Sequence, residues 1–225
     1  MNELHANTSL QNRRYAIKKT LGQGGFGITY LAYDNVNRRQ VAIKEFFMKE
    51  LCNRNGKHHM SVPSTGSRKL VDKFRAKFLK EANTIANLSH PNIIKIYDIF
   101  EENATAYYAM EYLSGKTVKQ LMASAGGRLS WDRALDIVRK TGIALDRMHR
   151  QAGVFHRDVS PENIMVMPDG SVKIIDFGSA KMLAISENQQ FSIVLKPGFA
   201  PPEQYSGKMN QGSFTDVYAL AGTFY

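Results

Sequence analysis

The chain has 225 residues, of which 43% are hydrophobic and 22% charged, a balance typical of a folded protein that buries one large core or two smaller ones. Its single cysteine, Cys52, excludes a disulfide framework and a zinc cluster, and the sequence has neither a long apolar run nor a signal-peptide pattern, so we expect a cytoplasmic protein. The net charge of +10 favours polyanionic ligands such as nucleotide phosphates. Because the basic residues are spread along the chain, they indicate a solvated surface rather than a nucleic-acid site.

The first third of the chain contains a glycine-rich turn between two predicted strands. Residues 1–13 are polar and aperiodic, which predicts a flexible tail, and residues 15–21 form a strand pattern. The turn, Gly-Gln-Gly-Gly-Phe-Gly at 22–27, is followed by β-branched and aromatic residues that predict a second strand rather than the helix of a dinucleotide fold. Glycines let backbone N–H groups approach phosphate oxygens closely, and Phe26 at the tip would shield them from water.

A third strand and an amphipathic helix follow. The strand at 41–44 ends in Lys44, a compact cation suited to phosphates, although an exposed edge-strand lysine is the alternative. Residues 47–69 form a polar insertion that is either a mobile loop or a docking element. In the helix predicted at 69–87, Glu81 borders the apolar stripe and could pair with Lys77 on the same helix. The stripe itself consists of Leu70, Phe74, Phe78, Ala82 and Ile85.

The middle of the chain predicts two strands, at 93–100 and 105–112, and a long helix that begins after Ser130 and ends near residue 150. We expect the apolar positions of this helix to belong to the core of a helical unit. They are Trp131, Leu135, Val138, Leu145 and Met148.

Acidic and amide side chains flank a predicted β-hairpin after this helix. Asp158 and Asn163 precede it, Asp176 follows it, and an Asp-Gly turn at 168–170 separates its strands at 164–166 and 172–175. The hairpin folds Asp176 back toward the other two side chains. Hard oxygen ligands of this kind suit Mg²⁺, which takes the rest of its shell from water and substrate phosphates.

Taken in order, these motifs resemble the protein kinase superfamily over residues 14–225. The resemblance rests on the glycine turn, Val-Ala-Ile-Lys at 41–44, His-Arg-Asp at 156–158 with Asn163, Asp-Phe-Gly at 176–178, and Pro-Pro-Glu at 201–203. Within the superfamily, the chain resembles eukaryotic-like serine/threonine kinases, including those of bacterial type. This resemblance implies an α+β, two-lobed fold with an antiparallel N-lobe at 14–112, and a mainly helical C-lobe at 113–225 that is incomplete at its C-terminus.

The resemblance implies transfer of the γ-phosphoryl of ATP, with Mg²⁺, to Ser/Thr hydroxyls of a protein substrate. From the charge distribution and the absence of a long apolar run we expect neither nucleic-acid nor membrane contact. The implied catalytic residues are Asp158, Lys44, Glu81, Asn163 and Lys196, and the metal ligands are Asn163 and Asp176. In this reading Glu81 pairs with Lys44, and Asp216 accepts hydrogen bonds from backbone amides of the catalytic loop. The implied nucleotide contacts are Leu21, Gly22, Gly24, Gly25, Phe26, Gly27, Thr29, Ala42, Lys44, Met110, Glu111, Leu113 and Met165.

Two departures from the family pattern concern one lysine. Ser160 occupies the catalytic-loop position that usually carries lysine, and Lys196 occupies the activation-segment position that usually carries threonine. We hypothesise a swap in which Lys196 supplies the cation missing from the loop, and a solvated Lys196 is the alternative. Thr29 replaces the usual valine with little change of shape. Arg157 could clamp a phosphoryl group on the activation segment, at Ser186 or Ser192.

The last residue, Tyr225, stops inside an apolar helix, so we expect a truncated chain in which Glu203 lacks its usual arginine partner. Two other functions stay open. One is a pseudokinase that acts as a scaffold, and the other is a small-molecule phosphotransferase of kinase-like fold.

Overall fold

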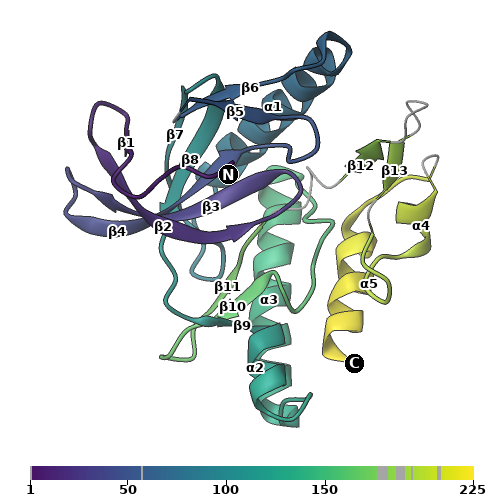
Figure 1. Ribbon diagram of the computed structural model, residues 1–225. Helices are drawn as coiled ribbons and strands as arrows, with labels where there is room; N and C mark the ends of the chain where they lie inside the picture. The colour runs from purple at the N-terminus through teal and green to yellow at the C-terminus, as the bar shows by residue number, and fades with distance from the viewer. Residues whose placement is uncertain (1, 57, 177–181, 186–190, 194, 207–208) are drawn as a thin grey trace. The chain divides into compact units, whose positions relative to one another are not determined.

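The computed structural model describes residues 2–56, 58–176, 182–185, 191–193, 195–206 and 209–225 (Figure 1). The chain divides into two compact units. The first contains Met1–Asn87 and Lys95–Tyr112, and the second contains Leu88–Ile94 and Leu113–Tyr225. In the described part of the chain, no helix is both long and apolar enough to cross a membrane.

The first unit is built on a six-stranded antiparallel sheet with the order β1-β2-β3-β4-β8-β7. Its strands are β1 Ser9–Leu10, β2 Tyr15–Gln23, β3 Gly27–Asp34, β4 Arg39–Phe46, β7 Ile96–Glu102 and β8 Thr105–Glu111. The strand predicted from residue 93 begins later, at Ile96, because Ile93 belongs to the second unit, where it forms a bridge with Ile174.

Helix α1, Thr65–Ala86, lies against β7 and β8 (Figure 1). Its buried stripe confirms the predicted face except that Val71 rather than Leu70 is buried. The rings of Phe78 and Phe46 lie 5.7 Å apart, which joins the helix to β4. The helix begins at Thr65 rather than at residue 69, so its first turn belongs to the stretch predicted as insertion.

The N-terminal tail and the 47–69 insertion both contain ordered strands of the first unit. The N-terminal tail was expected to be flexible, but β1 pairs with β2, and Leu4 and Leu10 are buried. The insertion forms a hairpin of β5, Asn53–Asn55, and β6, His59–Ser61. Few but well-placed apolar side chains explain the difference, because a short polar segment orders when its isolated apolar residues reach the core.

The second unit combines short strands with helices. The three-stranded sheet has the order β11-β10-β9, and the predicted hairpin is confirmed by pairing of Ile164 with Ile174. At its turn Gly170 has φ +79°, a left-handed conformation that favours glycine. The elements are β9 Lys116–Thr117, α2 Val118–Ser124, α3 Trp131–Ala152, β10 Ile164–Val166, β11 Val172–Ile174, β12 Met182–Ile185, β13 Phe191–Ile193, α4 Pro202–Tyr205 and α5 Ser213–Phe224.

Helix α3 confirms the predicted long helix but presents a different face to the core. Trp131 is 67% exposed and Leu135 is 46% exposed, so the prediction that both are core residues is wrong. The buried stripe is shifted around the helix and consists of Ile137, Thr141, Ala144, Leu145 and Met148. The helix ends at Gly153, whose left-handed backbone closes the last turn by donating to the His149 carbonyl.

Candidate active site

The predicted nucleotide contacts of the first unit lie on four neighbouring strands, β2, β3, β4 and β8, and in the turn between β2 and β3. The register places Thr29 of β3 opposite Lys44 of β4, and Ala42 of β4 opposite Met110 of β8. Ala42 and Met110 are buried. Strand pairing therefore brings an apolar pair and the lysine onto adjacent positions of one sheet.

The glycine turn between β2 and β3 is closed by a hydrogen bond of 2.9 Å from the Gly24 N–H to the Gly27 carbonyl. A Cβ atom on Gly27 would lie 2.7 Å from the Glu45 carbonyl oxygen, so only glycine permits this approach to β4. The Phe26 ring lies 5.7 Å from the ring of Phe74 on α1. Gly22, Gly24 and Gly25 are exposed, as is Leu21.

The predicted hinge residues lie at the end of β8 and just after it. The Glu111 N–H donates to the Lys95 carbonyl at 2.9 Å, and a Glu111 carboxylate oxygen accepts from the Lys95 N–H at 2.8 Å. Two hydrogen bonds to the Lys95 backbone, one from the Glu111 N–H and one to the Glu111 side chain, thus hold the end of β8 in place. Leu113 and Met165 belong to the second unit, with Met165 in β10. The pairing of Glu81 with Lys44 stays a prediction.

Asp216 of α5 holds the backbone of the catalytic loop. Its carboxylate accepts from the N–H groups of His156 and Arg157, each at 2.7 Å, and from the ring of His149 at 2.7 Å. Asp216 is fully buried, and Arg157 has a left-handed backbone with φ +63°. These bonds confirm the predicted role of Asp216 toward the loop amides. The Gln204 side chain adds a bond of 2.9 Å to the Arg157 carbonyl.

His156 is buried, and burial lowers its pKa because the charged ring would lose its hydration, while the carboxylates of Asp216, Asp158 and Asp176 oppose this effect. The Asp158 N–H donates to Nδ1 at 3.2 Å, and Nε2 lies 3.2 Å from the Ile175 carbonyl. A neutral ring with its proton on Nε2 satisfies both contacts. His156 therefore connects the loop before the hairpin with the strand end after it.

The hairpin joins Asn163, which contacts Asp158, to Asp176 directly after its second strand. Asn163 is buried and donates from Nδ2 to the Asp158 carbonyl at 2.7 Å and to the Asp158 carboxylate. The Ile175 N–H donates to the Asn163 carbonyl at 2.9 Å, which fixes the residue directly before Asp176. Asp176 has φ +54°.

Lys196 enters this site from the activation segment. Its ammonium nitrogen donates to the Ser160 hydroxyl at 2.7 Å and lies 3.5 Å from an Asp158 carboxylate oxygen. Glu162 accepts from Lys196 at 2.9 Å and from Lys119 of α2 at 2.5 Å, and bonds from both lysines lower the pKa of Glu162 to about 2. Sequence reasoning did not identify Glu162 or Lys119, although Glu162 lies within the loop motif.

Glu203 has a partner that the sequence analysis missed. The Thr215 hydroxyl donates to the Glu203 carboxylate at 2.9 Å and accepts from the Gly212 N–H at 3.2 Å. Both side chains are buried. The sequence signal for this contact was the position of Thr215 at the start of a predicted helix. That position does not show that the hydroxyl contacts a carboxylate twelve residues earlier.

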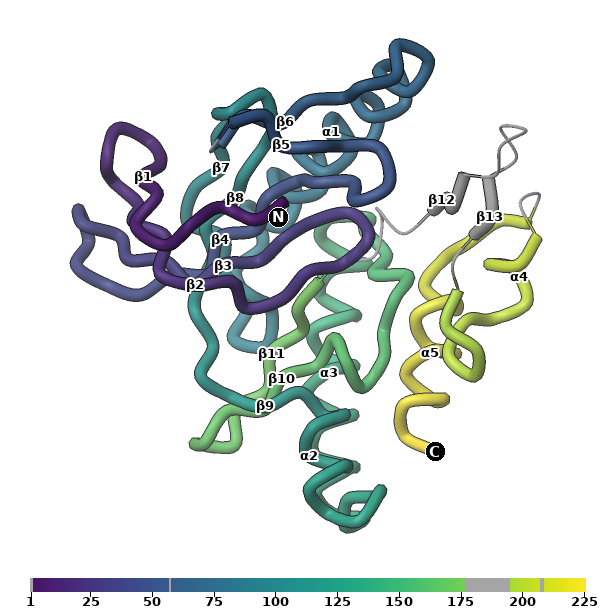
Figure 2. Tube along the Cα trace, viewed as in Figure 1, coloured from purple at the N-terminus to yellow at the C-terminus, as the bar shows by residue number. Residues whose placement is uncertain are grey.

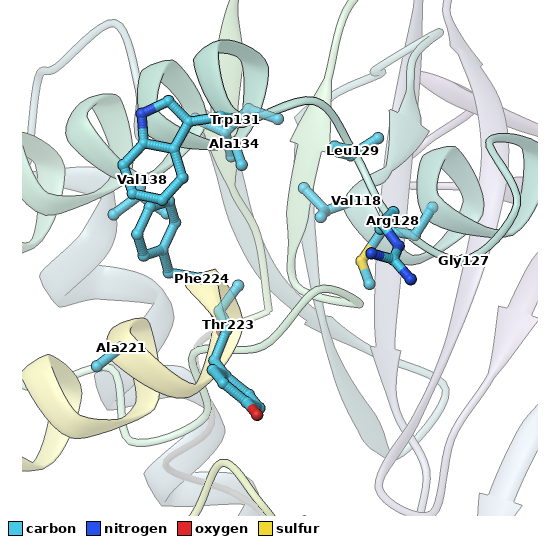
Figure 3. Close-up of a pocket in the computed structure, with 13 residues that line it drawn as sticks. Val118, Gly127, Arg128, Leu129, Trp131, Ala134, Val138, Ala221, Thr223 and Phe224 are labelled. Atoms are coloured by element: carbon cyan, nitrogen blue, oxygen red, sulfur yellow. The ribbon is translucent and has the colours of Figure 1, made fainter.

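An apolar pocket of about 670 Å³ lies among α2, α3 and α5 in the second unit (Figure 3). Trp131 and Phe224 line it, with ring centroids 5.0 Å apart. None of the predicted site residues lines this pocket. Phe177, Gly178 and the candidate phosphosite Ser186 lie outside the described residues, and the side chain of Ser192 also falls outside them.

Comparison with known proteins identifies the family. The protein kinase domain family matches residues 15–225, so the chain belongs to this family. It is 34% identical over 213 residues to serine/threonine-protein kinase PknA of Mycobacterium tuberculosis (strain ATCC 25177 / H37Ra), covering 92% of this chain and 44% of PknA. It is 34% identical over 208 residues to serine/threonine-protein kinase PrkC of Bacillus subtilis (strain 168), covering 92% of this chain and 29% of PrkC.

Solved structures agree with this assignment and confirm the predicted α+β kinase fold. The apo form of PpkA-294 matches with a TM-score of 0.85 and 33% identity, over 99% of this chain and 77% of that one. The PknI kinase domain of Mycobacterium tuberculosis matches with a TM-score of 0.71 and 26% identity, over 99% of this chain and 76% of that one. The chain spans less than half the length of the curated relatives named above.

Proposed function

We propose that this chain is a serine/threonine protein kinase domain that transfers the γ-phosphoryl of ATP to hydroxyl groups of protein substrates. The contact of the Lys196 ammonium group with Ser160 and Asp158 carries the proposal, because it brings an ammonium group to the loop position at which Ser160 replaces the usual lysine. In the reaction the acceptor oxygen bonds to the γ-phosphorus, the bond to the β,γ-bridging oxygen breaks, and ADP leaves. Because ATP is the donor, we expect the reaction in the cytoplasm.

Asp158 is the proposed base. Its side chain is only 8% exposed, and the Asn163 amide donates to its carboxylate, so its orientation is set before a substrate arrives. The carboxylate would orient the acceptor hydroxyl and take its proton.

Lys196 is the proposed counter-charge for the transferring phosphoryl group. An ammonium group beside the base would stabilise negative charge on the phosphoryl oxygens, which is the main electrostatic contribution in this chemistry. Glu162 holds Lys196 close to the loop through an ion pair of 2.9 Å, and the bonds from Lys119 and Lys196 lower its pKa to about 2, so this carboxylate stays charged even in mildly acidic solution. In the first unit, Lys44 and the glycine turn would hold the phosphates, with Glu81 positioning Lys44.

The donor set fits Mg²⁺. The side-chain Nδ2 of Asn163 donates to Asp158, which leaves the side-chain oxygen, Oδ1, as the atom that Asn163 would offer to a cation. Asp176 would offer a carboxylate oxygen. Among the described residues no group of three or more His, Cys, Asp or Glu is placed to hold a metal. Two hard oxygen ligands suit an ion that keeps waters and binds substrate phosphates. When bound, Mg²⁺ would neutralise phosphate charge.

Phosphoryl transfer from γ-labelled Mg-ATP to casein and myelin basic protein tests the proposal, with Asp158→Asn as the control. We expect labelled phosphoserine and phosphothreonine with the natural chain, and about a hundredfold or greater loss in the control. Nucleotide binding without transfer to protein would contradict the proposal and favour a scaffold. Transfer to small metabolites alone would favour the small-molecule phosphotransferase.

A further inference from the structure

A buried polar cluster lies beneath β4 in the first unit. Glu45, which follows Lys44 in the strand, is fully buried and accepts hydrogen bonds from the hydroxyls of Tyr30 at 2.7 Å and Tyr107 at 2.8 Å. The Arg54 guanidinium group completes the cluster, with its Nη2 atom 2.8 Å from the Glu45 Oε2 atom. The Arg54 side chain is only 2% exposed. A buried carboxylate requires such a partner, so Arg54 is held firmly in this place.

Arg54 belongs to β5 and joins the insertion to the sheet. It donates to the carbonyl groups of Asn2 at 2.9 Å and His58 at 2.5 Å, and its guanidinium carbon lies 5.2 Å from the centroid of the Phe47 ring. The insertion therefore contacts the N-terminal segment, its own turn and the residue that directly follows β4.

The segment that follows β4 holds the glycine turn. The Phe47 N–H donates to the Phe26 carbonyl at 3.1 Å, and the Lys49 N–H donates to the Gly25 carbonyl at 3.2 Å. Figure 2 shows the β2–β3 turn beside this segment. Phe47 and Met48 are buried, so the backbone that offers these donors is anchored in the core.

We propose that residues 47–49 act as a brace that fixes the glycine turn in position for nucleotide phosphates, with Arg54 and the Lys49 amide as positioning groups. The inference rests on the proposed function for the identity of the nucleotide. A glycine-rich turn has high conformational entropy, and ordering it on binding weakens affinity. Two hydrogen bonds from an anchored segment reduce this cost before the nucleotide binds.

A pair of substitutions at exposed Lys49 isolates the brace. Lys49→Pro removes the backbone N–H that holds Gly25, whereas Lys49→Ala removes only the side chain and keeps this donor. Hydrogen–deuterium exchange of a peptide containing residues 24–27, without nucleotide, reports the mobility of the turn. Equilibrium binding of a fluorescent ATP analogue with Mg²⁺ reports the affinity.

We expect Lys49→Pro to exchange faster and bind nucleotide more weakly, each by about 2-fold to 12-fold, the range of one net hydrogen bond. Lys49→Ala should match the natural chain in both measurements. Equal exchange in Lys49→Pro and the natural chain would overturn the brace, and so would faster exchange with unchanged affinity.

Glu45→Gln provides a second test if the proline variant unfolds. It keeps the size of the side chain but removes the charge that holds Arg54, so exchange at residues 24–27 should again increase. Unchanged exchange in this folded variant would overturn the proposal. Neither measurement needs turnover, so a braced turn in a chain that transfers no phosphate would contradict the proposed function alone.

Discussion

The ammonium nitrogen of Lys196 lies 2.7 Å from the hydroxyl oxygen of Ser160, thirty-six residues earlier in the chain. The same nitrogen lies 3.5 Å from the Asp158 carboxylate and 2.9 Å from Glu162. A residue of the activation segment thus contacts the loop position at which the family usually carries a lysine. This is the contact that the swap hypothesis requires, and the catalytic role of Lys196 is the prediction that follows from it.

Replacing Lys196 by alanine should reduce kcat by about 10²-fold to 10³-fold, because the developing phosphoryl charge would lose its cation. The Kd for ATP should stay within about twofold, since the phosphates are proposed to bind Lys44 and the glycine turn. Steady-state kinetics and nucleotide binding check the two quantities.

Lys119→Ala is the matched control for Lys196, because it removes a second lysine from Glu162 but from a position that is 67% exposed. It should change kcat by less than about threefold, since exposed ion pairs contribute little. An equal loss of kcat in both variants would show that the effect arises from Glu162 rather than from a cation beside Asp158.

Thr215→Val should lower the free energy of unfolding by about 1.5–3 kcal/mol, the range for a hydrogen bond to a charged group. The substitution keeps the shape of the buried side chain but removes the hydroxyl that donates to Glu203. Thr215→Ser retains the hydroxyl and should recover at least half of the loss. Urea unfolding measures both, and a valine variant as stable as the natural chain would rule out this contact as a stabilising interaction of Glu203.

Stability should fall as the pH falls below the ordinary histidine pKa of 6.5, because His156 has a lowered pKa in the folded chain. Between the two pKa values the unfolded chain binds a proton that the folded chain does not, so the free energy of unfolding rises with pH. Below pH 6.5 this group removes up to about 1.4 kcal/mol per pH unit, until its folded pKa is reached. Denaturation at about pH 7, 6 and 5 measures the slope.

His156→Asn serves as the comparison in this titration, since asparagine can still accept from the Asp158 N–H but does not titrate. Its stability should depend less on pH than that of the natural chain. Parallel curves for the two chains would contradict a buried neutral His156.

Local sequence patterns correctly predicted the elements that depend only on neighbouring residues, namely one hairpin and two helices. The Asp-Gly turn predicted the β10–β11 hairpin, and helical periodicity predicted α1 and α3, because each signal is complete within one segment. Family resemblance added Asp216, whose bonds to His156 and Arg157 cross about sixty residues. Periodicity alone contains no information about such contacts.

The failures concern contacts that tertiary packing creates. Arg54 looked like one polar residue in a polar insertion, but its burial against Glu45 depends on how the hairpin folds onto the sheet. Leu10 likewise belongs to a tail whose single leucines give no periodic signal. Trp131 was predicted to be core because it is apolar, yet it lies in the first turn of α3, outside the buried stripe.

The exchange of the two lysine positions tests the account most directly, by measuring kcat for Lys196→Thr and for the double variant Ser160→Lys with Lys196→Thr. The single variant should lose turnover, and the double variant should recover at least about tenfold of it, because the cation returns to the same loop from the usual family position. A folded, nucleotide-binding double variant that is as inactive as Lys196→Thr, or a single variant with normal turnover, would contradict the claim that Lys196 supplies the catalytic cation.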